Sequence, residues 1–383
     1  MNNASPGRKS PALPFAIAAH ALGVVLLLGS SLASSFAESS FKGLGFLPGG
    51  KISSASAVSD DGKVVVGWTS APILVGGEQV PQAFRWTADG GMVSLGCMPG
   101  DYPLSCAFAV SSDGSVVAGY GAAVSGTEAF RWTARNGLVR LGYLSGRRKK
   151  EGAAMAMSSD GSVVAGDAGY QAFRWTAAGG MVGLESHMIQ GAHSLATAIS
   201  SDGKIIVGLG VSPLEVQAFR WTEADGMVGL GYLPGGSNSS AQAVSRDGFV
   251  IVGSSSSTSG TEPFRWTAAG GMVGLGHLPG STNGVAWAVS GDGSVIVGVS
   301  VSKFDSDQTA FVWNNVNGTR RLQSVLSNDY HLNLTGWKLQ KAKGISADGT
   351  TIVGDGDHNG NMEAWVVHLD RPLNAPAGKE RSR

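Results

Sequence analysis

One aromatic-rich segment recurs along this chain and constrains its fold more than any other feature. Its first copy is AFRWTADGGMVSLGCMPG, from Ala83 to Gly100. Related copies begin at Ala129, Ala172, Ala218, Pro263 and Ala310. A reaction centre is needed only once, so a segment that recurs with its aromatic residues in register encodes a repeated structural unit. Function is then to be sought where the copies differ.

A second mark, a Ser-x-Asp-Gly turn before β-branched residues, repeats with the first. Its clearest copy is SSDGSVVAG, from Ser111 to Gly119. The turn glycine recurs at Gly62, Gly114, Gly161, Gly203, Gly248, Gly293 and Gly349. The first aromatic residue of AFRW recurs at Phe84, Phe130, Phe173, Phe219, Phe264, Phe311 and, in EAWVV, Trp365. Both marks therefore indicate seven units.

Each unit predicts four short strands. An Ala/Val/Ser-rich strand such as SASAVS leads into the Asp-Gly turn and a VVVG-like strand, and AFRWT and MVSLG follow across a second glycine turn. Asp-Gly between β-branched residues predicts a two-residue type I′ hairpin. Four strands in about 45 residues is the period of a propeller blade. The sequence therefore predicts an all-β, seven-bladed β-propeller with four-stranded blades.

The two ends of the repeat region predict how the ring closes. Leu-Gly-like fourth strands follow AFRW at Leu95, Leu141, Leu184, Leu230, Leu275 and Leu322, but the seventh unit ends at AWVVHLD without one. The segment GLGFLPG, from Gly43 to Gly49, is such a fourth strand with no unit before it. We expect this N-terminal strand to complete the last blade, which leaves no long strand edge exposed.

The combined motif AFRWTxxGGMxxLGxLPGG with SxDGxVVVG resembles the HAF-type extracellular repeat family, from about Gly43 to Leu369. The resemblance implies an exported repeat protein. It implies no established activity, so no catalytic residues are carried over. The last two units depart from the motif, with Val312 in place of the arginine and Trp365-Val366-Val367 in place of Phe-Arg-Trp.

The N-terminus predicts export. Arg8 and Lys9 precede an apolar run from Phe15 to Leu28, and small residues follow as far as Ala37, which is the pattern of a cleaved signal peptide. The expected organisation is a signal peptide at 1–37, the propeller at 38–370 and a disordered polar tail at 371–383. We expect a monomer that is secreted, periplasmic or at the cell surface; an uncleaved membrane anchor is the alternative. The formal net charge of zero gives no general attraction to nucleic acid or to anionic lipid. We expect no nucleic-acid partner and no stable membrane insertion after cleavage.

Two sets of residues have structural interpretations. Cys97 and Cys106 are the only cysteines, and in an exported chain a nearby pair predicts a disulfide that closes one loop. The Phe and Trp of AFRW are expected to pack between blades. A charge between blades needs a partner, so we expect the Asp of the Asp-Gly turns to pair with the repeated arginines, Arg85, Arg131, Arg174, Arg220 and Arg265.

The loops that differ between units all fall on one face of the predicted propeller. The turns between strands one and two, and between three and four, are short and uniform, whereas the other connections vary, and variable loops on a rigid scaffold are where binding is concentrated. Candidate ligand contacts on this variable face are the basic run Arg147, Arg148, Lys149 and Lys150; Glu185, His187 and His193, which could also ligate a metal or transfer protons; and Tyr330, His331, Trp337 and Lys338 near the channel mouth. Solvated loops and simple packing remain the alternatives at each place.

One segment resembles the first half of a calcium loop. Asp355, Asp357, Asn359 and Asn361 alternate, with Gly360 between the last two, but Val366 stands where a bidentate Glu is required. A calcium site and a plain turn are both open, and no other cofactor is expected. We expect a non-catalytic binding or scaffolding protein for an extracellular glycan or protein; the alternative is a glycan-active hydrolase or lyase with its site at the channel mouth.

Overall fold

A computed structural model describes residues 38–75, 78–98, 102–123, 126–146, 151–184, 193–212, 215–303 and 307–374. All of them belong to one compact unit, Ala37–Arg383. The described residues form 28 strands and a single helix, which confirms the all-β prediction. None of their helices has the length and apolar character that a membrane crossing requires. The predicted signal peptide, 1–37, lies outside the described residues.

The strands form antiparallel groups of four. The first three groups are β2 (Ser53–Val58), β3 (Val64–Val75), β4 (Glu78–Thr87) and β5 (Gly91–Gly96); β6 (Ser105–Val110), β7 (Val116–Ala123), β8 (Gly126–Thr133) and β9 (Gly137–Arg140); and β10 (Gly152–Met157), β11 (Val163–Ala168), β12 (Gln171–Thr176) and β13 (Gly180–Gly183). The next two are β14 (His193–Ile199), β15 (Ile206–Val211), β16 (Val216–Thr222) and β17 (Gly226–Gly229); and β18 (Ser239–Val244), β19 (Ile251–Ser257), β20 (Gly260–Thr267) and β21 (Gly271–Gly274). The sixth is β22 (Ser281–Val289), β23 (Val295–Ser302), β24 (Gln308–Asn314) and β25 (Gly318–Arg321).

The last group combines the two ends of the described chain. It contains β26 (Trp337–Ile345), β27 (Thr351–His358), β28 (Asn361–His368) and, paired antiparallel to β28, β1 (Ser40–Gly43). The register runs from Ser40 opposite His368 to Gly43 opposite Trp365. The pairing strand therefore ends where the GLGFLPG segment begins. Hydrogen bonding gives six sheets rather than seven separate ones, because a single parallel pair, Thr261 with Asn283, joins groups five and six into eight strands.

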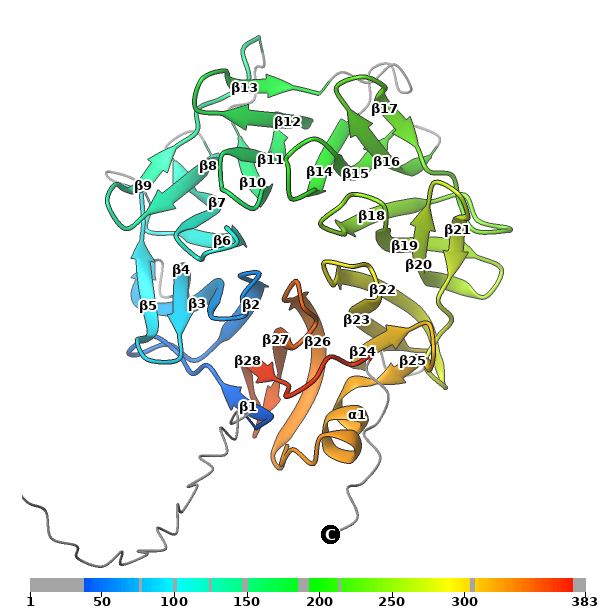
Figure 1. Cartoon of the computed structure of the whole chain (residues 1–383). Coiled ribbons are helices and arrows are strands. Elements are labelled where there is room, and N and C mark those ends of the chain that lie inside the picture. The colour runs from blue at the N-terminus through cyan, green and yellow to red at the C-terminus, as the bar shows by residue number, and fades with distance from the viewer. Residues whose placement is uncertain are drawn as a thin grey trace, which may run out of the picture. The chain divides into compact units, whose positions relative to one another are not determined.

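The groups follow one another around a ring, with the first strand of each nearest the centre (Figure 1). The repeated aromatic residues fill the space between groups, as predicted. Phe84 packs with Leu44 and Val353 of the last group, and Phe130 packs with Val64 of the first. The six phenylalanines and Trp365 are at most 1% exposed. Each group thus buries its third strand against the preceding group.

The Ser-x-Asp-Gly connections are not the predicted two-residue type I′ hairpins. In the first group β2 ends at Val58 and β3 begins at Val64, so five residues connect them. Ser59 Oγ donates to Asp61 Oδ1 over 2.6 Å and accepts the backbone N–H of Val64 over 3.0 Å. Only the glycine, Gly62, has a positive φ, of 73°. The serine bonds build a wider turn than Asp-Gly alone would give.

Two features near the C-terminus were not expected. The fourth strand predicted at Leu322 forms as β25, which ends one residue before it, but a helix follows at once: α1 (Leu322–Asp329) buries Leu322, Val325 and Leu326. This apolar spacing spans about one turn, too little to stand out as a helical period. The tail is ordered as far as residue 374, because Leu373 is buried in the core and its carbonyl accepts a hydrogen bond from Asn314 Nδ2 over 3.0 Å. Residues 375–383 of the predicted tail lie outside the described residues.

Candidate functional site

The face of the ring that carries the Ser-x-Asp-Gly turns, here called the turn face, is chemically uniform. All seven Ser-x-Asp-Gly turns make the serine-to-aspartate and backbone-to-serine hydrogen bonds seen at Ser59. The bond from Ser111 is the main cause that lowers the pKa of Asp113 to about 2. The hydrogen bonds of these aspartates therefore stabilise the turns.

The repeated arginines reach these turns but bond a different atom from the one expected. Arg85 Nε donates to the carbonyl of Gly114, and Arg131 Nε donates to that of Gly161, both over 3.1 Å. Each acceptor is the turn glycine of the next group. Arg220 makes an ion pair of 3.5 Å with Asp225, in the other uniform turn of its own group. At Arg85 and Arg131 the predicted pairing with an Asp-Gly carboxylate is therefore replaced by a bond to the glycine carbonyl, whereas Arg220–Asp225 is an Arg–Asp pair within one group, as predicted.

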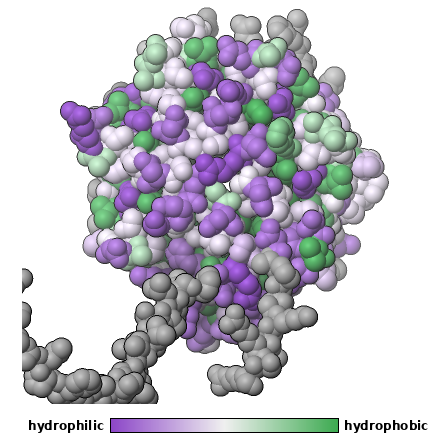
Figure 2. All heavy atoms as spheres, viewed as in Figure 1, coloured by the Kyte–Doolittle hydropathy of each residue, from purple (hydrophilic) through white to green (hydrophobic). Residues whose placement is uncertain are grey.

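At the centre of the turn face, residues from different groups of the ring contact one another. The second residue of each Ser-x-Asp-Gly turn lies there, and six backbone N–H···O bonds of 2.8 to 3.2 Å link consecutive turns from Ser112 round to Asp60. Arg246 Nη1 crosses the ring to Asp60 Oδ2, 3.1 Å away, and Ser159 Oγ donates to the same oxygen over 3.3 Å. A cavity of only about 140 Å³ remains inside. Figure 2 shows hydrophilic residues over the centre of the face in view.

The variable face carries an exposed aromatic platform. Tyr170, at the turn between β11 and β12, is 48% exposed, and its ring stacks on His193 at 4.5 Å between centroids and 15° between planes. The turn is a true type I′ pair, with φ of 55° at Gly169 and 67° at Tyr170. Non-glycine residues are strained there, and such strain is concentrated at functional sites. The structure thus places the predicted His193 beside a tyrosine that sequence reasoning missed.

A perturbed carboxyl group lies on the same hairpin as the platform. Asp167 is on β11, three residues before Tyr170, and is only partly exposed. Burial is the main cause that raises the pKa of Asp167, and the charge of Glu151 adds to it. No other side chain of the described residues bonds the Asp167 carboxylate in the structure. This carboxyl therefore holds a proton more readily than an ordinary aspartate.

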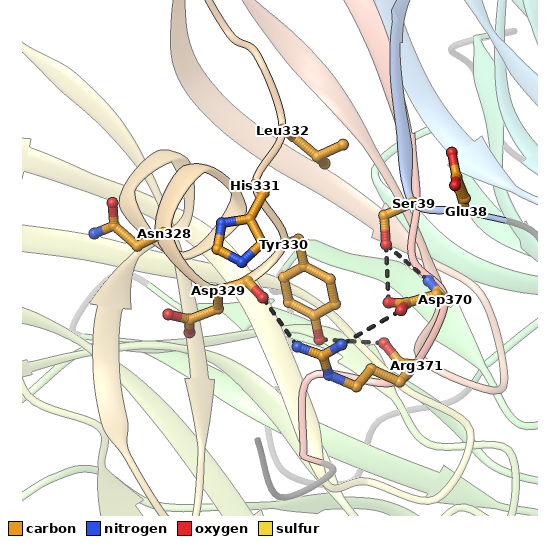
Figure 3. Close-up of a pocket in the computed structure, with 9 residues that line it drawn as sticks. All are labelled: Glu38, Ser39, Asn328, Asp329, Tyr330, His331, Leu332, Asp370 and Arg371. Atoms are coloured by element: carbon orange, nitrogen blue, oxygen red, sulfur yellow. Dashed lines mark hydrogen bonds and ion pairs between the residues drawn. The ribbon is translucent and has the colours of Figure 1, made fainter. Parts of the chain in front are cut away.

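A second cavity, of about 660 Å³, lies beside α1 and includes the predicted Tyr330 and His331. Arg371 stacks on the Tyr330 ring at 4.7 Å and donates to the Asp329 carbonyl over 2.9 Å (Figure 3). Asp370 accepts from Ser39 Oγ over 2.9 Å. Burial raises the pKa of Tyr330 to about 12. The polar groups of this cavity connect both ends of the described chain to α1. The helix lies at the outside of the ring rather than at the predicted channel mouth (Figure 1).

Trp337 packs, which settles one of the open alternatives. Its ring stacks on His358 at 4.2 Å and 10°, and Phe41 of β1 contacts it edge-on at 5.1 Å. His358 Nδ1 lies 2.7 Å from Glu363 Oε2, and the other Glu363 oxygen accepts Gly45 N–H over 2.9 Å. Lys338 is paired with Asp307 over 2.6 Å. This cluster ties β1 to the last group.

The calcium-loop segment folds as a β-hairpin. Asp355 and Asp357 lie on β27, Asn361 begins β28, and Asn359-Gly360 is a type I′ turn with φ of 52° and 89°. Asp355 is 1% exposed, pairs with Lys343 and accepts Ser54 Oγ over 2.7 Å. The residues therefore do not wrap around a common point, and the calcium-loop geometry is wrong. Among the described residues, no group of three or more His, Cys, Asp or Glu could hold a metal ion.

The predicted disulfide is also wrong. Cys97 and Cys106 are both free. Cys97 follows β5, the outermost strand of the first group, whereas Cys106 lies on β6, the innermost strand of the second. Burial raises the pKa of the Cys106 thiol to about 11, and its hydrogen-bond partner is Tyr120. Of the other candidates, Arg147, Arg148, Lys149, Lys150, Glu185 and His187 lie outside the described residues.

No model of a protein family matches this sequence, and no curated protein sequence matches it. Solved structures do resemble its fold. An oligogalacturonate lyase from Vibrio parahaemolyticus has a TM-score of 0.56 at 11% identity, over 86% of this chain and 97% of that one. An oligogalacturonate lyase in complex with manganese has a TM-score of 0.55 at 12% identity, over 87% and 96%. TolB from Acinetobacter baumannii has a TM-score of 0.45 at 12% identity, over 82% of each chain. With these lyases the chain shares a β-propeller fold.

Proposed function

We propose that this chain is an exported, non-catalytic β-propeller that binds a glycan through its variable face. The ring has seven four-stranded blades, and β1 completes the seventh. The pairing of β1 with β28 supports the closure, as does the 3.2 Å hydrogen bond from Ala347 N–H, in the last blade, to the Asp60 carbonyl in the first. The single Thr261–Asn283 pair supports two blades within the eight-stranded sheet.

The observation that carries the proposal is the Tyr170–His193 platform. Exposed aromatic rings in a fixed orientation offer an apolar surface to the C–H face of a sugar, at little cost in side-chain entropy. The Tyr170 ring is half-exposed and its backbone is held at a positive φ by a two-residue turn. The four basic residues Arg147–Lys150 directly precede Glu151 in the sequence. Glu151 in turn lies close enough for its charge to act on Asp167, which is on the same hairpin as Tyr170. Because four positive charges in a row attract an anion, we infer that the glycan is acidic.

Export and family also belong to this proposal. The signal-peptide pattern at 1–37 supports a secreted, periplasmic or cell-surface location for a monomer, and the repeat motif supports membership of the HAF-type extracellular repeat family. We include a divalent cation in the proposal only because one solved structure of similar fold is a complex with manganese. Binding should therefore be measured with manganese or calcium and with a chelator.

A glycan array tests the proposal. The purified chain is compared with Tyr170→Ala and with Phe249→Ala, a matched control in which an aromatic residue exposed at 70% is removed from the turn face. We expect acidic glycans to bind the wild type and Phe249→Ala alike, and Tyr170→Ala to lose about tenfold in affinity or more, the size of one stacking contact. Failure of the wild type to bind any glycan would overturn the proposal and favour a protein ligand.

The second candidate is a glycan-active lyase or hydrolase, and Asp167 is the observation that favours it. A carboxyl group with a raised pKa, near a second carboxylate and an exposed platform, has the chemistry of a general acid. Incubation with oligogalacturonates distinguishes the two functions. New chain ends that vanish in Asp167→Asn would establish catalysis, and unchanged oligomers after long incubation would exclude it for this substrate.

A further inference from the structure

The innermost strands of all seven groups share one irregularity. Each carries a β-bulge at the same point, within an Ala-x-Ala segment that becomes Ala-x-Gly in the last group. The residue x is skipped in the pairing. The alanine before it has no exposed surface in any copy: Ala55, Ala107, Ala154, Ala196, Ala241, Ala286 and Ala342. Bulges of this kind re-aim a side chain next to a site.

The second strand of each group is adapted to the bulge. A glycine always faces it, and a Cβ at that glycine would clash with a carbonyl oxygen of the inner strand. These glycines are Gly67, Gly119, Gly166, Gly208, Gly253, Gly298 and Gly354. The fully buried alanine and the glycine are the same in every group, so the backbone presents x in the same way seven times.

The residue at x, by contrast, differs in every group. In ring order the seven are Ser56, Phe108, Met155, Thr197, Gln242, Trp287 and Lys343. None of them is buried, and Trp287 is exposed at 36%. They lie on the innermost strands, which surround the middle of the ring (Figure 1). The part of the ring bounded by these seven residues is here called the central channel. The scaffold is constant and the channel wall is variable.

The channel is closed at one end. Val110, Met157 and Ile199, each two residues beyond an x residue, line the 140 Å³ cavity under the Arg246–Asp60 pair. A ligand of the channel would therefore have to reach it from the variable face. His193 begins the strand that carries Thr197, four residues on and about 13 Å along a strand. His193 of the platform thus lies at the start of the inner strand that carries the x residue Thr197.

We propose that the seven x residues form the specificity-determining wall of a glycan site, into which one end of the glycan chain enters. This inference rests on the proposed function and deepens it. Trp287 is the principal contact, because a large ring exposed to the channel stacks on a sugar, whereas Phe108 already stacks on Tyr120 at 5.5 Å. Gln242 and Ser56 offer hydrogen-bonding groups along the same wall, whereas the Thr197 hydroxyl already donates to the Ala241 carbonyl over 3.0 Å. Lys343 is paired with Asp355 and bonded to Ser54, so its charge is already compensated on this wall.

Binding of oligogalacturonates and of the array glycans to Trp287→Ala tests this inference. We expect a loss of about tenfold in affinity or more, with binding restored by Trp287→Phe and unchanged in Phe249→Ala. Circular dichroism and the melting temperature report whether Trp287→Ala folds; Gln242→Ala, a smaller change on the same wall, should weaken binding as well. Because one chain end enters the channel, affinity per chain should be the same for short and long oligogalacturonates.

The outcomes separate the two proposals. If Tyr170→Ala loses binding while Trp287→Ala and Gln242→Ala retain it, the channel site is wrong and the variable-face function stands. Affinity per chain that rises with chain length contradicts entry of a chain end. If the wild type binds no glycan, both proposals fall.

Discussion

Two aspartates at equivalent positions show how one residue type can have opposite effects on stability. Asp167 and Asp355 each follow the glycine that faces the bulge. Asp355 is buried, paired with Lys343 and bonded by Ser54. In the third group the x residue is Met155, so Asp167 lacks that cation and burial raises its pKa. Burial therefore penalises the ionised form of Asp167, whereas the Asp355 carboxylate has a cation and a hydroxyl group as partners.

We predict that Asp355→Asn and Asp167→Asn change stability in opposite directions. Breaking the buried pair at Asp355 should cost about 3–5 kcal/mol, because it leaves Lys343 unpaired. A carboxyl whose folded pKa lies above its unfolded value destabilises the fold at pH values above the unfolded value. Asp167→Asn should therefore stabilise the protein slightly at pH 7 and have no effect near pH 3. Urea unfolding at both pH values measures this, and loss of stability in Asp167→Asn at pH 7 would refute it.

At the scale of the elements, strands and turns that depend on neighbouring residues in the sequence were predicted. Features that depend on contacts between distant residues were not. Alternation and turn residues gave the four-strand unit, its order and the packing role of Phe84 and its equivalents. The bulges were missed, because period-2 alternation does not reveal an extra residue. The Asn359-Gly360 hairpin was misread as a calcium loop although Asn-Gly is the strongest short hairpin signal.

The candidate site was only partly predictable for the same reason. His193 was chosen from its residue type and loop position, and the structure places it on the variable face. The positive φ of Tyr170, which is not a glycine, has no sequence signature. The packing of Trp337 depends on Phe41, which lies nearly 300 residues earlier. The free cysteines follow from the placement of β5 and β6 at opposite edges of their sheets.

The glycine that faces each bulge gives a prediction for a single element. At Gly208 a Cβ would clash with the Leu195 carbonyl. We therefore expect Gly208→Ala to destabilise the protein by about 1–3 kcal/mol, as overpacking does. Gly179→Ala, in an exposed turn where only the Thr176 hydroxyl is near, is the matched control. Equal denaturation midpoints for the two variants would show that the bulge does not require glycine.

At the scale of the whole molecule, one uniform face stabilises a ring whose other face is free to vary. The seven serine-held turns and the backbone bonds between them form a continuous network. The connections on the opposite face differ in length and sequence from group to group, and they carry the platform. Variation in those loops leaves the ring bonds intact, which is how one scaffold can present many contacts to a single ligand.

The turn aspartates predict a cooperative loss of stability in acid. Serine hydrogen bonds are the main cause that lowers the pKa of Asp113, Asp160 and Asp202. A group with a lowered folded pKa contributes its full stability above the unfolded value, about 3.9, and loses it as pH falls through the folded value. The melting temperature should therefore fall between pH 4 and about 2, the pKa of Asp113. A melting temperature that is constant over this range would contradict the role given to these turns.

Hydrogen–deuterium exchange of the chain with and without its best-binding array glycan tests the central claim most directly. The account predicts slower exchange in the β11–β12 turn around Tyr170, at the start of β14 and along the inner strands that bear the x residues. It predicts no change in the Ser-x-Asp-Gly turns. Protection confined to those turns, or to the α1 cavity around Tyr330 and Arg371, would contradict recognition through the variable face.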